Sequence, residues 1–109
     1  MEKREDVGAC LDIGHAFLEA KRREINPRWH ITRAIEKLSE KLIHVHVHDN
    51  GGYYDEHLIP GEEEIDFTPI GKTLRRARYD GAVVVELFRA KDELRAARLG
   101  LQRIQKMFG

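Results

Sequence analysis

Short apolar runs alternate along the chain with segments in which apolar residues recur every three or four positions. Runs of a length suited to β-strands occupy residues 7–13, 42–48 and 82–87. Helical spacing follows them at residues 16–24, 27–41, 66–77 and about 91–107. Strands that alternate with amphipathic helices favour parallel pairing with right-handed crossovers. The pattern therefore predicts an α/β fold of three consecutive βα units, in one domain over residues 1–109.

Boundary residues support two of the predicted helices. Asn26 can cap a helix whose first turn accommodates Pro27, and Asp66 can cap the next one. Asp80 and Gly81 end that helix before the third strand. The last helix is expected to bury one stripe of apolar side chains, formed by Leu94, Ala97, Leu101, Ile104 and Phe108.

The third predicted strand and the long loop each lead to a specific expectation about the fold. Residues 82–87 are apolar except for Glu86, as expected for a parallel strand that is covered on both faces. The loop at 49–64 is long and contains Gly51, Gly52, Pro60 and Gly61. Loops of this length in compact domains are usually functional. We therefore expect this loop to contribute to a site.

Composition narrows the classes of partner and compartment. The chain has 19 basic and 19 acidic residues, so its net charge gives no reason to expect binding to nucleic acid or to a membrane surface. No apolar stretch has the length of a membrane span, and the charged start of the chain does not resemble a signal peptide. Cys10 has no internal disulfide partner and is expected to be a buried, inert thiol. These features predict a cytoplasmic protein.

The strand at 42–48 has the most informative sequence in the chain. Three histidines, His44, His46 and His48, alternate with aliphatic residues and would share one face of the strand. Imidazole is the commonest metal ligand among side chains, so the row indicates a metal site. A histidine that is merely hydrogen-bonded in the core is the alternative for any single member.

Each predicted strand ends in a potential ligand. The first ends at Asp12, the second at His46 and the residues that follow it, and the third at Glu86. In parallel α/β folds, ligands collect at the carboxyl ends of the strands. Such a mixed set of oxygen and nitrogen donors suits Mn, Zn, Co, Fe or Mg. For Glu86, an ion pair with an arginine is the alternative.

The ordered set of motifs resembles the xylose isomerase-like TIM barrels. This superfamily contains sugar isomerases and epimerases, and also abasic-site endonucleases of the endonuclease IV type. The matching features are Asp-x-x-His at the first strand end, His-x-x-Asp at the second, Asp-x-His followed by glycine in the loop, and Glu at the third. They lie in residues 11–15, 45–50, 55–61, 65–67 and 79–86.

The resemblance implies a role for each matching residue. The metal ligands would be Asp12, His46 and Glu86, and Glu86 would also act as a catalytic acid or base. His15 would contact substrate during catalysis, or would bind an additional metal together with Asp55 and His57.

Neighbours of the implied ligands would have supporting roles. His48 and Asp49 would orient His46. His44 would lie deeper in the barrel and serve structure, and no role is assigned to His30.

The chain also departs from the family. The family fold is an eight-stranded barrel of roughly 250 residues, whereas this chain resembles only its last three βα units. The glutamate that the family has on the strand before Asp12 is absent, and Glu62, Glu63 and Glu64 do not replace it. Three parallel strands leave two open edges and an uncovered inner face. We therefore expect a homo-oligomer or a complementary barrel fragment as partner.

The sequence thus favours a divalent-metal-dependent isomerase or epimerase acting on a small sugar or sugar phosphate. The reaction would be proton transfer next to a carbonyl through an enediolate. One alternative is a non-catalytic or incomplete barrel fragment that needs a partner. Another is an endonuclease IV-like phosphodiesterase acting at abasic sites, which the balanced charge disfavours.

Overall fold

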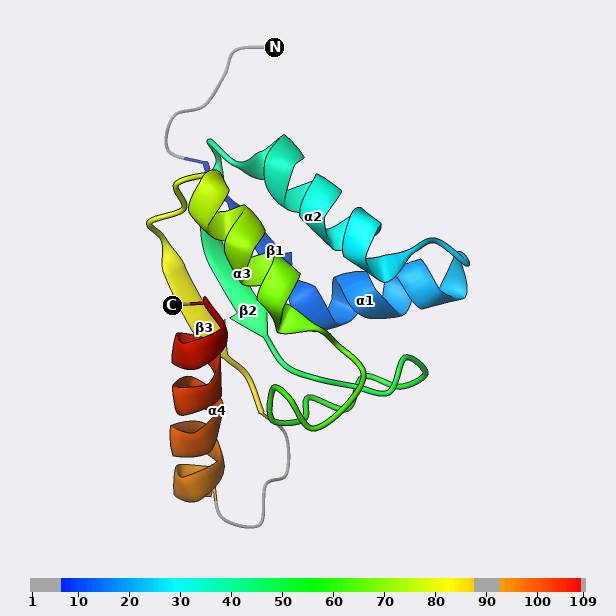
Figure 1. Cartoon of the computed structure of the whole chain (residues 1–109), viewed down its shortest axis with the longest axis vertical. Coiled ribbons are helices and arrows are strands. Elements are labelled where there is room, and N and C mark those ends of the chain that lie inside the picture. The colour runs from blue at the N-terminus through cyan, green and yellow to red at the C-terminus, as the bar shows by residue number, and fades with distance from the viewer. Residues whose placement is uncertain (1–6, 88–92, 109) are drawn as a thin grey trace.

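The computed structural model describes residues 7–87 and 93–108, which form one parallel sheet with helices between the strands (Figure 1). The first half contains β1 (Ala9–Asp12), α1 (Ile13–Arg22), α2 (Pro27–Leu38) and β2 (Leu42–Val47). The second half contains α3 (Phe67–Arg76), β3 (Ala82–Val85) and α4 (Glu93–Phe108). The predicted α/β order with parallel strands is confirmed.

The sheet has the order β1-β2-β3, and both pairs of strands are parallel. Asp12 is the register partner of His46, and His46 is in turn the partner of Val84. Residues that are partners in neighbouring strands point to the same face of a sheet. The register therefore places the ends of the three strands side by side, where the long loop also lies (Figure 1).

The helices cover one face of the sheet. Val45 and Val47 are fully buried on that face, in a core shared with residues of all four helices. The opposite face exposes His44 and Val84, and Val84 keeps 37% of its surface exposed. The expectation that both faces of β3 are covered is therefore wrong. That face would line the interior of a complete barrel, and no described element packs over it.

Capping side chains set where three helices begin. Asp12 accepts a hydrogen bond from the backbone N–H of His15, Asn26 from that of Trp29, and Asp66 from that of Thr68. The predicted caps Asn26 and Asp66 are confirmed. Helix α1 begins directly after β1 at Ile13, whereas the sequence pattern predicted a loop and a helix from residue 16.

The buried face of α4 agrees only in part with the predicted stripe. Leu94 and Leu101 are 71% and 48% exposed, whereas Ala96, Gly100 and Ile104 are buried. Small residues allow a close approach to the sheet: a Cβ added to Gly100 would lie 3.0 Å from Cγ1 of Val85. The stripe was predicted from helical spacing, and its member Ile104 does lie in the core, with Phe108 packed against that core. Residues 91 and 92 of the predicted helix lie outside the described residues.

Two more findings concern the surface. Cys10 is exposed on the open face of the sheet, so the expectation of a buried thiol is wrong. Within residues 7–87 and 93–108, no helix combines the length and the apolar character needed to cross a membrane.

Candidate functional site

The ends of the three strands bring together a carboxylate, an imidazole and a second carboxylate. Asp12, His46 and Glu86 each offer one ligand atom, and these atoms all lie within 4.8 Å of one another. Nδ1 of His46 is 2.6 Å from Oε1 of Glu86. We call these three residues the strand-end group. All three are partly accessible, so a small molecule can reach them from the open face of the sheet.

The strand-end group fits a divalent cation. Two carboxylates and one imidazole form a donor set that suits Mn, Zn, Co, Fe or Mg. Coordination requires a deprotonated carboxylate. Although burial acts to raise the pKa of Asp12, hydrogen bonds from His48 and from the backbone of His15 bring that pKa below its ordinary value. Asp12 is therefore ionised at neutral pH and ready to bind a cation.

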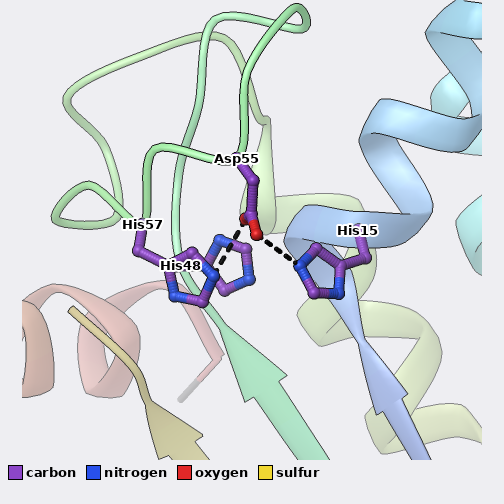
Figure 2. Close-up of side chains that lie close together, drawn as sticks. All are labelled: His15, His48, Asp55 and His57. Carbon is purple, nitrogen blue, oxygen red and sulfur yellow. Dashed lines mark hydrogen bonds and ion pairs between the residues drawn. The ribbon is translucent and has the colours of Figure 1, made fainter. Parts of the chain in front are cut away.

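A second group lies where α1 meets the long loop (Figure 2). It is next to the first group, because its member His48 contacts Asp12. His15, His48, Asp55 and His57 each offer a ligand atom within 4.8 Å of the others. Asp55 joins two of them, because its Oδ2 lies 2.9 Å from Nε2 of His15 and its Oδ1 lies 2.9 Å from Nε2 of His57. We call these four residues the loop group. His15, Asp55 and His57, which the family resemblance associated with an additional metal or with substrate, are thus in contact.

Asp49 fixes the loop that supplies Asp55 and His57. Its carboxylate is fully buried and accepts hydrogen bonds from four backbone N–H groups at 2.9–3.1 Å. The donors are Asn50, Gly61, Glu63 and Ile65. The backbone of Asp49 also pairs with that of Leu58 in an isolated antiparallel bridge. One buried carboxyl group therefore holds together backbone segments from both ends of the loop.

His57 has an unusual backbone conformation within this loop. Its φ is 50°, a left-handed value that non-glycine residues seldom adopt, and its side chain is almost fully buried. The ring of His57 stacks on that of His48, with centroids 3.6 Å apart and planes 6° from parallel. Strained backbone of this kind clusters at functional sites, where the surrounding structure holds it in place.

The imidazoles of the loop group differ in basicity. The hydrogen bond to Asp55 raises the pKa of His15 above its ordinary value and outweighs the opposing effect of burial. Burial, together with the nearby imidazole of His48, lowers the pKa of His57 despite the neighbouring carboxylates. At neutral pH, His57 is therefore a neutral imidazole, the form that binds metals.

Several residues lie where the sequence did not place them. His48 was expected to share the face of His46, but it follows the last residue of β2, is fully buried and contacts Asp12. Asp49 organises the loop. The resemblance assigned His48 and Asp49 to orienting His46. In the structure, His48 contacts Asp12, and Asp49 binds the backbone of the loop. His44 is exposed, and its ring centroid lies 6.0 Å from that of His46. Nε2 of His30 lies 3.8 Å from Oε1 of Glu19.

Sequence reasoning missed the role of Gly14. A Cβ at this position would lie 1.9 Å from Cε1 of His48, so the imidazole occupies the space that any other side chain would need. A glycine directly after the end of a strand, beside a candidate ligand, was the only available signal.

The amino-acid sequence is similar to a known protein family and to two curated proteins. The sequence model of the family described as "Xylose isomerase-like TIM barrel" matches residues 1–107. Two uncharacterized proteins of Methanocaldococcus jannaschii, MJ1311 and MJ1614, are each 34% identical to this chain, over 92 and 76 residues. The matches cover 84% and 70% of this chain, but 29% and 26% of those proteins.

A solved structure agrees with this result. The crystal structure of a D-tagatose 3-epimerase-like protein superposes with a TM-score of 0.72 at 32% sequence identity. The match covers 98% of this chain and 38% of that protein, so the chain corresponds to a minor part of a larger barrel. The chain belongs to the xylose isomerase-like TIM barrel family.

Proposed function

We propose that this chain supplies three metal ligands and a catalytic carboxylate to a divalent-metal-dependent sugar isomerase or epimerase. The proposal depends chiefly on one observation, the convergence of the ligand atoms of Asp12, His46 and Glu86 within 4.8 Å. The likeness to a D-tagatose 3-epimerase-like protein supports a sugar or a sugar phosphate as substrate.

The positions of the residues suggest a separate catalytic role for the cation, for Glu86 and for His15. A divalent cation in the strand-end group would act as a Lewis acid toward a carbonyl and stabilise negative charge on its oxygen. Glu86 lies at the same position and would accept or return a proton at the carbon next to that carbonyl, through an enediolate. His15 lies beside Asp12, with its Nδ1 3.3 Å from Oδ2, and would hold a substrate hydroxyl.

The complete active site would need a partner for this chain. The chain spans less than a third of the curated relatives named above, and the open face of the sheet exposes Val84. Leu94 and Leu101 leave a second apolar strip exposed on α4. The edge strands β1 and β3 also present backbone groups with which another chain can pair. We propose a second copy of the chain or a complementary barrel segment as the partner, with an inactive, incomplete unit as the outcome if none binds.

An endonuclease IV-like activity at abasic sites is a second candidate. The contacts among His15, Asp55 and His57 favour it, because an additional metal suits phosphoryl transfer. The balanced charge of the chain disfavours it, because backbone phosphates attract basic surfaces. Nicking of a duplex with one synthetic abasic site, beside an intact duplex as control, would decide between the two candidates.

Two measurements test the main proposal. Elemental analysis of a size-exclusion peak of known mass should find a divalent metal bound and should give the oligomeric state. Incubation with a ketose and Mn²⁺ in D₂O should then place deuterium on the carbon next to the carbonyl, as observed by NMR. Glu86→Gln should abolish this exchange, while Glu56→Gln in the loop should not. A chain that holds no metal, and binds none on titration, would contradict the proposal.

A further inference from the structure

His48 is a polar side chain in a fully buried position. Its Nε2 lies 2.7 Å from Oδ1 of Asp12, and the carboxylate can only accept this hydrogen bond. His48 therefore donates through Nε2. Within the part of the chain that the structure describes, Nδ1 of His48 is buried and has no hydrogen-bond partner. Burying such an atom costs stability, so an apolar residue would serve a purely structural purpose better.

The bond from His48 restricts how Asp12 can turn. Oδ1 of Asp12 accepts two hydrogen bonds, one from His48 and one of 3.0 Å from the backbone N–H of His15. Two donors on one oxygen fix the rotation of the carboxylate. The other oxygen, Oδ2, has Nδ1 of His15 at 3.3 Å and is left to bind a ligand.

The ring of His48 is itself held in place by two neighbours. Gly14 provides its space, because a Cβ there would lie 2.2 Å from Nδ1 and still closer to Cε1. His57 stacks on the ring with centroids 3.6 Å apart. His57 also contacts Asp55, so the position of the loop is coupled to the ring that holds Asp12.

We infer that His48 is a positioning residue, which fixes the carboxylate of Asp12 for cation binding and is itself held by Gly14 and His57. The inference rests on the proposed function, because it concerns the orientation of a ligand in the strand-end group. It pairs His48 with Asp12, and it gives Gly14 a role in cation binding although glycine has no side-chain ligand atom.

Variants at two positions test this inference. His48→Leu removes the donor and the unpaired nitrogen, so we expect Mn²⁺ affinity to fall by about 10–100-fold while thermal stability stays the same or rises. His48→Gln has a side-chain N–H that can reach Asp12 and should restore most of the affinity. Gly14→Ala changes no donor, yet it should weaken Mn²⁺ binding because its Cβ displaces the ring. Calorimetric titration measures affinity, and thermal unfolding shows whether each variant is folded.

Two results would overturn the inference: wild-type affinity in His48→Leu, or equal weakening in His48→Gln and His48→Leu. If the wild-type chain binds no Mn²⁺, the proposed function fails, and NMR of the metal-free chain still tests the positioning role. Long-range ¹H–¹⁵N spectra should show His48 protonated at Nε2, with a signal that moves in Asp12→Ala. Protonation at Nδ1 alone, with no proton on Nε2, would overturn the inference independently of any metal.

Discussion

Asp12 and His46 are register partners on neighbouring parallel strands. Neighbouring strands lie about 4.8 Å apart, so this pairing sets two ligands side by side although the residues are distant in the chain. Glu86 then contacts His46 from the end of the third strand. The geometry of the candidate metal site follows from the sheet register.

Replacement of His46 tests the role of the register in metal binding. His46→Ala removes the imidazole of the strand-end group from a partly exposed position, so the fold should persist. We expect Mn²⁺ affinity to fall by more than about 100-fold, beyond the loss typical of a supporting residue. Titration calorimetry measures the affinity, and circular dichroism follows the fold.

His44→Ala is the matched control for this variant. It removes an exposed histidine from the same strand, outside both candidate groups. It should bind Mn²⁺ like the wild type. Full metal occupancy in His46→Ala, or equal losses in the two variants, would show that the ligand assignment is wrong.

The sequence predicted the parts of the fold that depend on local pattern. Alternating apolar runs and helical spacing indicated the parallel sheet, and residues at the strand ends indicated Asp12, His46 and Glu86. Strict alternation failed for His48, because β2 ends at Val47 and the chain then turns. The predicted stripe of α4 failed for Leu94 and Leu101, which are exposed, because the helix approaches the sheet through Gly100. Contacts such as that of His48 with Gly14 depend on the tertiary fold, which a local pattern does not encode.

Asp49 should be important for stability. Asp49→Ala leaves four backbone N–H groups without their buried acceptor, so we expect the free energy of unfolding to fall by about 3 kcal/mol or more. Asp66→Ala is the comparison, since that exposed carboxylate caps a helix and its loss should cost only about 1 kcal/mol. Urea unfolding measures both values. A smaller loss in Asp49→Ala than in Asp66→Ala would contradict this account of the loop.

Gly71 tests the contact between α3 and α4. Alanine raises helix propensity by about 1 kcal/mol, but its Cβ would lie 2.8 Å from Cδ1 and 2.9 Å from Cα of Phe108. Relieving such an overlap costs about 1–3 kcal/mol. We therefore expect Gly71→Ala to lower the melting temperature, whereas Gly51→Ala, with no atom nearer than 3.5 Å, should change it little. A stabilised Gly71→Ala would mean that α4 does not pack at this position.

The ion pair between His15 and Asp55 should depend on pH in the metal-free chain. Because Asp55 raises the pKa of His15, the pair stabilises the fold fully below pH 6.5, the ordinary pKa of histidine, and this stability is lost as pH rises through the raised value. Asp55→Asn should therefore destabilise the chain more at pH 5.5 than at pH 8. The side chains are 53% and 44% exposed, so the difference should be less than about 1 kcal/mol.

An NMR titration of His15 in EDTA checks the cause of this effect. The pKa of His15 should be above 6.5 in the wild type and should fall in Asp55→Asn. An unchanged pKa would show that Asp55 is not its partner in solution.

Anomalous diffraction from crystals grown with Mn²⁺ tests the central claim most directly. The account predicts a peak within coordination distance of Asp12, His46 and Glu86 together. The absence of a peak there in an ordered map, or a peak only at His15, Asp55 and His57, would contradict the assignment of the strand-end group as the metal site.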